Sequence, residues 1–225
     1  MDKYEYYRKA KEFEENNTKY IIDKIITKGW GNIILDYKTI PNGIGNIKKD
    51  MLLKLSDNRW VPFELKASSY MHSDGLVEIV QDIEDTKKMK EYLKPCIGEK
   101  LEPNFIKELL NEIPHMYVIN PRSKGWFFTS KADYIIYSYY SEGLENIKKS
   151  SIPEIIYLVN YSHLKKFLDN ISKRYYCREA KRGYGWTVNL AIPWEDLIND
   201  DVATIIKVKN KKDVQPFKIR LKVNT

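Results

Sequence analysis

The sequence predicts an α/β protein with a central mixed β-sheet flanked by helices. At the N-terminus, apolar residues recur at three- and four-residue spacing, which is the period of an amphipathic helix. Further along, short apolar runs typical of strands alternate with charged, helix-forming segments. The 225 residues suffice for one sizeable core, so we expect a single domain over 1–225. Its core would extend to about residue 160, with a solvated helical insertion at 85–115 and C-terminal accessory elements over 160–225.

The composition of the chain indicates which partner and which cellular location to expect. The 38 Lys and Arg residues exceed the 31 Asp and Glu residues, giving a net charge of +7. This balance suits an anionic partner such as nucleic acid, although many lysine-rich chains are only soluble. Cys96 and Cys177 are too few and too far apart for a thiolate metal cage or a disulfide framework. No apolar run approaches membrane-spanning length and no leader is evident, so we expect a cytoplasmic protein without a membrane partner.

The N-terminal helix is predicted from Tyr4 to about Lys28, with Gly29 at the position of a C-cap. Most glutamates on helices are solvated. Glu14, however, lies seven and eleven residues before Ile21 and Ile25, which would place it on the same stripe. We therefore expect Glu14 to face inward.

Two strands joined by a turn form the most informative part of the chain. An apolar run covers 51–55, the turn formers Ser-Asp-Asn follow at 56–58, and a second run begins at Trp60. A strand at 32–37 and a glycine-rich turn at 41–46 precede this hairpin. A third strand is expected at 76–83 and a tyrosine-rich strand at 134–140.

Charged residues occupy the ends of the hairpin strands. Asp50 opens the first strand, and Glu64 and Lys66, which point the same way, close the second. Pairing through the short turn brings Asp50 near Glu64. Charges beside a core are costly unless they are paired, and two carboxylates with room for water suit a hard cation such as Mg²⁺. The alternative interpretation is a hairpin with solvated charges at its ends.

This layout resembles the PD-(D/E)XK nuclease superfamily. Asp50 takes the place of the Asp and Glu64-Leu65-Lys66 that of the (D/E)XK segment, although Lys49 stands where the motif has Pro. The resemblance implies a restriction-endonuclease-like core with the N-terminal helix next to the active site. It also implies a metal-binding glutamate on that helix, a role that we assign to Glu14, with Glu15 as the alternative.

A phage-associated subgroup of this superfamily has further elements in the same order. Glu78 matches a glutamate on the strand after E-x-K, and Gly125-Trp126, Ser130, Ala132-Asp133-Tyr134 and Tyr137 match a later segment. The resemblance spans roughly residues 10–140. Glu78 is a further candidate for the metal site. An aromatic core strand is the alternative interpretation of Tyr134 and Tyr137.

The last third of the chain has predictable elements without evident chemistry. We expect a strand at 154–160, a short amphipathic helix from His163, a hairpin about Gly183 and Gly185, and a helix after Pro193. Basic and apolar residues then alternate, which would serve either to follow a phosphate backbone or to protect an edge strand from pairing. The alternating basic residues are Lys207, Lys209, Lys218, Arg220 and Lys222.

The resemblance implies a Mg²⁺- or Mn²⁺-dependent nuclease that hydrolyses phosphodiester bonds, with DNA as the expected partner, in a bacterial or phage-infected cell. Asp50, Glu64 and the carbonyl of Leu65 would hold the metal, Lys66 would position the attacking water and Glu14 would complete the site. A homodimer is compatible with the sequence. The rival hypotheses are a nuclease fold that has lost catalysis, and an enzyme of another class, for which no nucleophile, nucleotide-loop or zinc motif is present.

Overall fold

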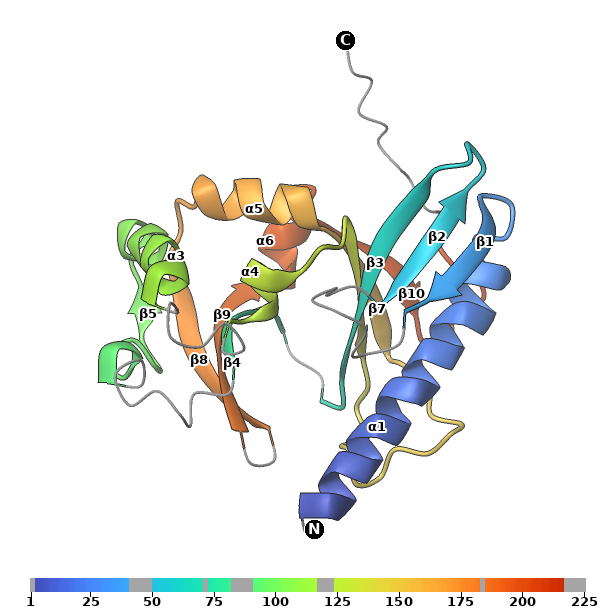
Figure 1. The fold of residues 1–225 in the computed structure, drawn as a ribbon, viewed down its shortest axis with the longest axis horizontal. Helices are drawn as coiled ribbons and strands as arrows, with labels where there is room; N and C mark the ends of the chain where they lie inside the picture. The colour runs from blue at the N-terminus through green and yellow to red at the C-terminus, as the bar shows by residue number, and fades with distance from the viewer. Residues whose placement is uncertain are drawn as a thin grey trace.

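The structure is a computed structural model that describes residues 3–40, 50–70, 73–81, 91–116, 124–182 and 185–216. The turn expected at 41–46, the end of the strand expected at 76–83 and the basic residues at 218–222 lie wholly or partly outside these ranges. In Figure 1 two β-sheets lie side by side, with the long N-terminal helix beside one of them. No helix in the described ranges is both long and apolar enough to cross a membrane.

The larger sheet has six strands in the order β1-β2-β3-β6-β7-β10. Strands β3 and β6 are parallel and the other neighbours are antiparallel, so this is the mixed sheet predicted from the sequence. The β2–β3 hairpin is confirmed, with Met51 opposite Phe63 and Lys54 opposite Trp60. The strands are β1 (Ile34–Thr39), β2 (Met51–Leu55), β3 (Trp60–Ser68), β6 (Tyr134–Tyr139), β7 (Ile155–Asn160) and β10 (Ala203–Val208).

A second, antiparallel sheet has four strands in the order β4-β9-β8-β5. Strand β4 follows β3 in the chain but pairs with β9, which comes more than a hundred residues later. Both sheets therefore combine strands from before and after residue 160. The hairpin expected about Gly185 is confirmed as β8–β9. The strands are β4 (Asp74–Gln81), β5 (Lys100–Leu101), β8 (Tyr175–Arg182) and β9 (Gly185–Pro193).

Helices flank both sheets, which confirms the predicted fold class. The first helix, α1, continues directly into a π-helix, η1, and α1 contacts β3. In Figure 1, α3 lies at the far side of the four-stranded sheet, and α5 and α6 lie near the place where the two sheets meet. The helices are α1 (Lys3–Tyr20), η1 (Ile21–Thr27), α3 (Pro103–Met116), α4 (Trp126–Thr129), α5 (Tyr161–Asp169) and α6 (Trp194–Asn199).

The six-stranded sheet buries both of its faces in separate cores. On one face, Ile21, Ile25 and Trp30 pack against Met51 and Phe63. The opposite face packs against the four-stranded sheet through an aromatic cluster in which the rings of Tyr157 and Trp194 stack 3.8 Å apart. Since apolar and aromatic burial dominates folding stability, this second core fixes the two sheets against each other.

Two predictions about helices are wrong. The helical insertion expected at 85–115 is not solvated in its described part, 91–115, because Ile106, Leu109 and Ile113 of α3 are fully buried in the second core. Nor does Glu14 face inward: its side chain is exposed, and the inward positions of α1 are Phe13 and Asn17. The helix changes from α to π geometry at Ile21, so α-helical spacing cannot be carried across that point.

Candidate active site

Strand β3 delivers two charged side chains to the space between the sheets. Phe63 and Leu65 pack into the core shared with η1. Because successive side chains of a strand alternate between faces, Glu64 and Lys66 point to the opposite side, toward the four-stranded sheet. Their strand lies in the interior of the sheet, where Glu64 pairs with Ile135 and Lys66 with Tyr137 of β6.

Asp50 joins them at the point where β2 begins. Its backbone N–H donates to the carbonyl of Phe63 at 2.9 Å, and its Oδ2 accepts a hydrogen bond from the N–H of Leu65 at 2.6 Å. The carboxylate thus occupies a place that a strand carbonyl would take if β2 continued. The structure therefore brings Asp50 beside the Glu64-Leu65-Lys66 segment, as the hairpin predicted.

Glu64 and Lys66 form a close ion pair. Lys66 Nζ lies 2.6 Å from Glu64 Oε1, and Glu64 is only 5% exposed. The other oxygen, Oε2, is buried and has no hydrogen-bond partner within the described part of the chain. Such an oxygen is costly to bury unless a cation or a donor reaches it. The pair therefore leaves one carboxylate oxygen available at the centre of the site.

The three charges perturb one another. Burial raises the pKa of Asp50 above its ordinary value, and the Leu65 hydrogen bond and the charge of Lys66 offset only part of this rise. Burial works to lower the pKa of Lys66, but the carboxylates around it, Glu64 first and then Glu78 and Asp50, raise it above the ordinary value. Lys66 is therefore a protonated donor at neutral pH, not a base.

The four-stranded sheet contributes a third carboxylate to the surroundings of Lys66. Glu78 of β4 is 2% exposed, and its Oε1 accepts a hydrogen bond from the backbone N–H of Trp126 at 3.4 Å. Position 125, directly before Trp126, requires glycine because a Cβ there would lie 2.2 Å from the carbonyl oxygen of Glu78. Gly125 therefore lets α4 approach β4 closely, and the backbone N–H of Trp126 donates a hydrogen bond to Glu78.

Tyr161 was not singled out from the sequence. It is the first residue of α5, it is 7% exposed, and its hydroxyl donates to the carbonyl of Phe127 in α4. Burial, followed by the negative charge of Glu64, raises the pKa of Tyr161 to about 12. The phenol is therefore neutral at physiological pH and lies within electrostatic range of Glu64. A tyrosine beginning a helix gives no sequence signal of this proximity.

The remaining predicted residues serve other purposes or lie on exposed surface. Ser130 is buried and its Oγ accepts a hydrogen bond from the backbone N–H of Ala132, while the backbone N–H of Asp133 donates to the carbonyl of Pro62 in β3. This segment therefore shapes the entry to β6. Glu15, like Glu14, is exposed on α1, and it forms an ion pair with Lys11 at 3.9 Å.

The oxygen donors fit a hard divalent cation with few protein ligands. Across the described ranges, no group of three or more His, Cys, Asp or Glu residues is arranged to hold a metal ion. The site instead offers two carboxylates, Asp50 and Glu64, on either side of the Leu65 peptide. Mg²⁺ is commonly held in this way, by one or two carboxylates together with waters and substrate phosphates.

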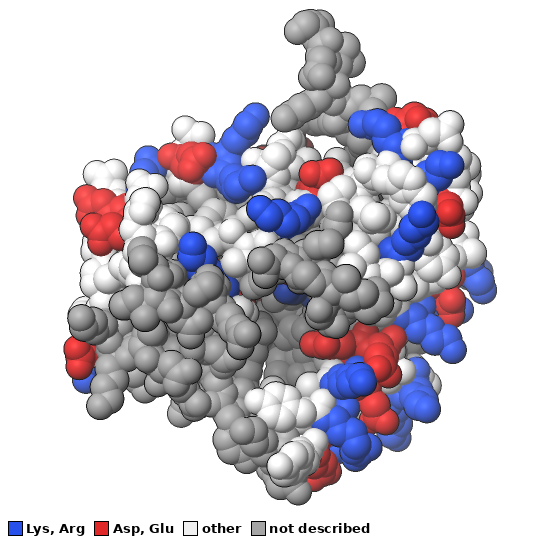
Figure 2. Space-filling view, in the orientation of Figure 1, with Lys and Arg blue, Asp and Glu red and all other residues white. Residues whose placement is uncertain are grey.

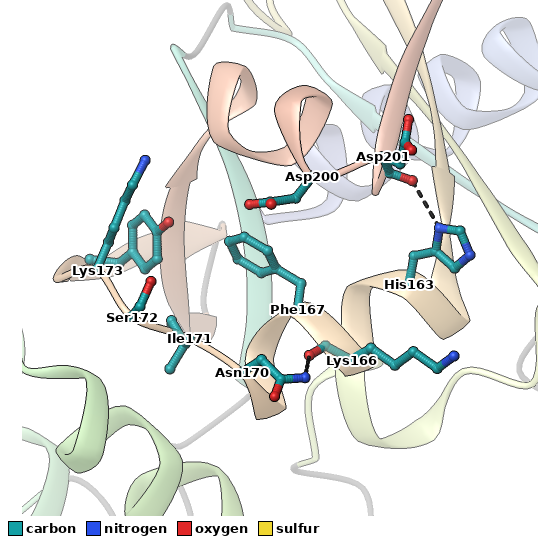
Figure 3. A pocket seen from close by; sticks show the side chains of 10 residues that line it. His163, Lys166, Phe167, Asn170, Ile171, Ser172, Lys173, Asp200 and Asp201 are labelled. Carbon is teal, nitrogen blue, oxygen red and sulfur yellow. Dashed lines mark hydrogen bonds between the residues drawn. The ribbon is translucent and has the colours of Figure 1, made fainter.

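A pocket elsewhere on the molecule is separate from these charges. It has a volume of about 410 Å³ and lies between the second half of α5 and the residues that follow α6. Figure 3 shows Phe167 at its centre and His163 at one side, where Nδ1 lies 2.9 Å from the carbonyl oxygen of Asp201. Its lining includes none of Asp50, Glu64, Lys66 or Glu78. The chemistry-bearing residues therefore do not line this pocket.

No protein-family model matches the chain, and no curated protein does. The structure is similar to that of restriction endonuclease MspI in complex with its cognate DNA, with a TM-score of 0.30 and 12% sequence identity. The match covers 80% of this chain and 82% of that chain. A similarity at these values does not assign a function to this chain.

Proposed function

We propose that this protein is a Mg²⁺-dependent nuclease that hydrolyses phosphodiester bonds in DNA. The observation that carries the proposal is the convergence of Asp50, Glu64 and Lys66 around the Leu65 peptide, with one buried Glu64 oxygen lacking a hydrogen-bond partner among the described residues. A carboxylate that is buried, oriented by a lysine and still open on one oxygen is suited to a cation. The net charge of +7 favours an anionic substrate.

Asp50, Glu64 and the carbonyl of Leu65 would hold the metal. The N–H and C=O of one strand residue point to the same neighbour, so the carbonyl of Leu65 is directed to the side on which Asp50 lies. When bound, Mg²⁺ would stabilise the charge that develops on the phosphate and lower the pKa of a coordinated water. Mn²⁺, with similar ligand preferences, is expected to substitute.

The chain's own residues orient the reactants and stabilise charge. In hydrolysis the attacking water releases one proton to solvent as its oxygen bonds to phosphorus, the bond to the leaving oxygen breaks, and that oxygen takes up a proton from solvent. Lys66, kept protonated by its carboxylate neighbours, would donate to the water or to a phosphate oxygen. Glu64 holds the ammonium of Lys66 in place.

The second candidate is a nuclease-fold protein that binds nucleic acid without cleaving it. The presence of Asp50, Glu64 and Lys66 in one arrangement argues against this loss. The cytoplasmic location, the homodimer and the phage-associated subgroup remain predictions from the sequence.

Glu64→Gln and Asp50→Asn test the proposal. Each retains the size and an acceptor oxygen but removes a ligand charge, so the rate of Mg²⁺-dependent cleavage should fall about a thousandfold or more. Plasmid, single-stranded and branched DNA serve as substrates, with Glu12→Gln, at an exposed position on α1, as the matched control. Near-normal cleavage by a folded Glu64→Gln protein would overturn the assignment.

A further inference from the structure

The face of the sheet that carries Glu64 and Lys66 continues onto exposed surface. Along β3, Trp60 and Pro62 share this face because they lie at two-residue steps from Glu64. Trp60 is opposite Lys54 of β2, and Lys38 of β1 is opposite Leu52, the neighbour of Pro62. The outer end of the three-stranded β1–β2–β3 unit thus presents an aromatic ring and two lysines in line with the proposed active site.

Trp60 is far more exposed than three other tryptophans of the chain. Trp30, Trp126 and Trp194 are 0%, 6% and 5% exposed, and each belongs to a core, whereas Trp60 is 37% exposed. Lys38 Nζ lies 4.7 Å from the centroid of its ring. Packing therefore accounts for three of these tryptophans but leaves a large part of the Trp60 ring open to solvent.

Charge around the ring favours an anion. Besides Lys38 and Lys54, Arg59 is adjacent to Trp60 in the chain and forms an ion pair with Asp57 at 2.6 Å. Asp36, opposite Lys54, is a further acidic residue here. In Figure 2, Lys and Arg side chains dot the part of the surface where Figure 1 places the β2–β3 hairpin. Lysines beside an exposed aromatic ring match the alternation of phosphates and bases in a nucleic acid strand.

We propose that Trp60, Lys38 and Lys54, here called the Trp60 platform, bind an unpaired base and its flanking phosphates on the strand that reaches Glu64 and Lys66. This inference rests on the proposed nuclease function. Glu64 is four residue steps along β3 from Trp60, a span of about 13 Å, so a single nucleic acid segment can contact both. The favoured DNA therefore has a single-stranded segment or end beside the cleaved bond.

We infer an unpaired base, not a base pair, because the exposed indole ring of Trp60 offers only a flat surface on which a free base can stack. Bases inside a duplex are already stacked, whereas a single-stranded base is free to stack on an aromatic side chain. Such stacking is stronger than an exposed cation–π contact, so a base displaces Lys38 from the ring. The released ammonium then contacts a phosphate of the same strand.

Binding of a fluorescent single-stranded oligonucleotide in EDTA tests the platform without cleavage. Trp60→Ala should weaken binding about tenfold, whereas Trp60→Phe should retain most of the affinity. Lys38→Gln and Lys54→Gln should each weaken binding and reduce its salt dependence. Tyr37→Ala is the matched control: Tyr37 is 41% exposed on β1, next to Lys38, but it pairs with Leu53 and so lies on the opposite face.

Each outcome of these binding measurements either supports or overturns the proposed Trp60 platform. A selective loss in Trp60→Ala for single-stranded over blunt duplex DNA, with Tyr37→Ala unaffected and both proteins equally stable to urea, supports it. Equal losses on both DNAs, or unchanged binding by Trp60→Ala, overturn it. If Trp60→Ala binds normally while Mg²⁺-dependent cleavage persists, the platform fails and the nuclease proposal stands. If the platform binds but no divalent ion supports cleavage, the nuclease proposal fails instead.

Discussion

At the scale of single residues, Lys66 is the side chain whose surroundings define its chemistry most closely. It is in ion-pair contact with Glu64 and within electrostatic range of Glu78 and Asp50. A cation held among three carboxylates beside the Leu65 peptide cannot accept a proton at neutral pH. Its contribution must come from donation and from positive charge, and both matter most when negative charge accumulates on the phosphate.

Lys66→Ala is therefore expected to lower kcat at saturating DNA by about a hundredfold or more, with a much smaller change in KM. An interaction made mainly in the transition state changes kcat, whereas uniform binding of substrate changes KM. Steady-state kinetics with Mg²⁺ provide the measurement, and Lys24→Ala, at an exposed position on η1, is the control. A loss confined to KM would make Lys66 a phosphate clamp instead.

Gly125 is expected to tolerate no side chain. A Cβ there would lie 2.2 Å from the carbonyl oxygen of Glu78, and all the nearest atoms belong to the backbone of β4, which leaves little room to relax. Gly125→Ala should therefore destabilise the protein by about 1–3 kcal/mol, the usual cost of overpacking, and should impair cleavage by moving α4 from β4. Urea unfolding measures the first effect. Gly98→Ala meets no atom within 4 Å of the added Cβ, but its φ of 88° strains an L side chain, so it should cost about 1–2 kcal/mol without affecting cleavage.

At the scale of elements, alternation along strands lets one element serve both structure and chemistry. On β3, Phe63 and Leu65 secure the sheet to η1 while Glu64 and Lys66 form the site. The last strand, β10, lies at the edge of the six-stranded sheet. There Lys209 pairs with Glu154 at 2.6 Å, and Lys207 donates to the carbonyls of Lys211 and Lys212. These contacts favour an edge-protecting role for the two lysines over a phosphate-binding one.

Lys209, which follows β10, forms an ion pair with Glu154, which precedes β7. The stability that this ion pair contributes should depend on pH. Hydrogen bonds from Lys209 and Ser141 lower the pKa of Glu154 below its ordinary value of 4.5. A carboxylate with a lowered folded-state pKa stabilises the protein above about pH 4.5 and loses this effect as the pH falls through the folded-state value. Glu154→Gln should therefore cost about 0.5–1 kcal/mol at pH 7, and less at pH 3. Urea titrations at both pH values check this, and a cost independent of pH would contradict it.

At the scale of the whole molecule, the proposed site lies where two sheets meet. Asp50, Glu64 and Lys66 come from the six-stranded sheet, and Glu78 comes from the four-stranded sheet. The aromatic cluster around Trp194 joins the two. The arrangement of the charges therefore depends on the packing between sheets, and a cation bound there should stabilise the folded protein.

We expect Ca²⁺ to support DNA binding without cleavage, while Mg²⁺ or Mn²⁺ supports both. Ca²⁺ shares the oxygen preference of Mg²⁺ but is larger and more flexibly coordinated, so it should offset the repulsion between Asp50, Glu64 and phosphate without activating water. Titrations of labelled DNA in EDTA, Ca²⁺ and Mg²⁺ measure this, and Glu64→Gln should lose most of the Ca²⁺ effect. Binding that is indifferent to metal, with no cleavage under any ion, would favour the inactive binding protein.

The sequence by itself determined the local elements. The β2–β3 hairpin, the placement of Glu64 and Lys66 on one face, the approach of Asp50 and the β8–β9 hairpin were all predictable, because turn residues and two-residue alternation act over a few positions. Only the tertiary structure decided the rest. Strand β4 pairs with β9 in a separate sheet, Tyr161 comes within range of Glu64, and α3 is buried, since packing between segments far apart in the chain controls all three. Glu14 faces solvent for a related reason: the helix changes geometry at Ile21, and no local pattern of spacing records that change.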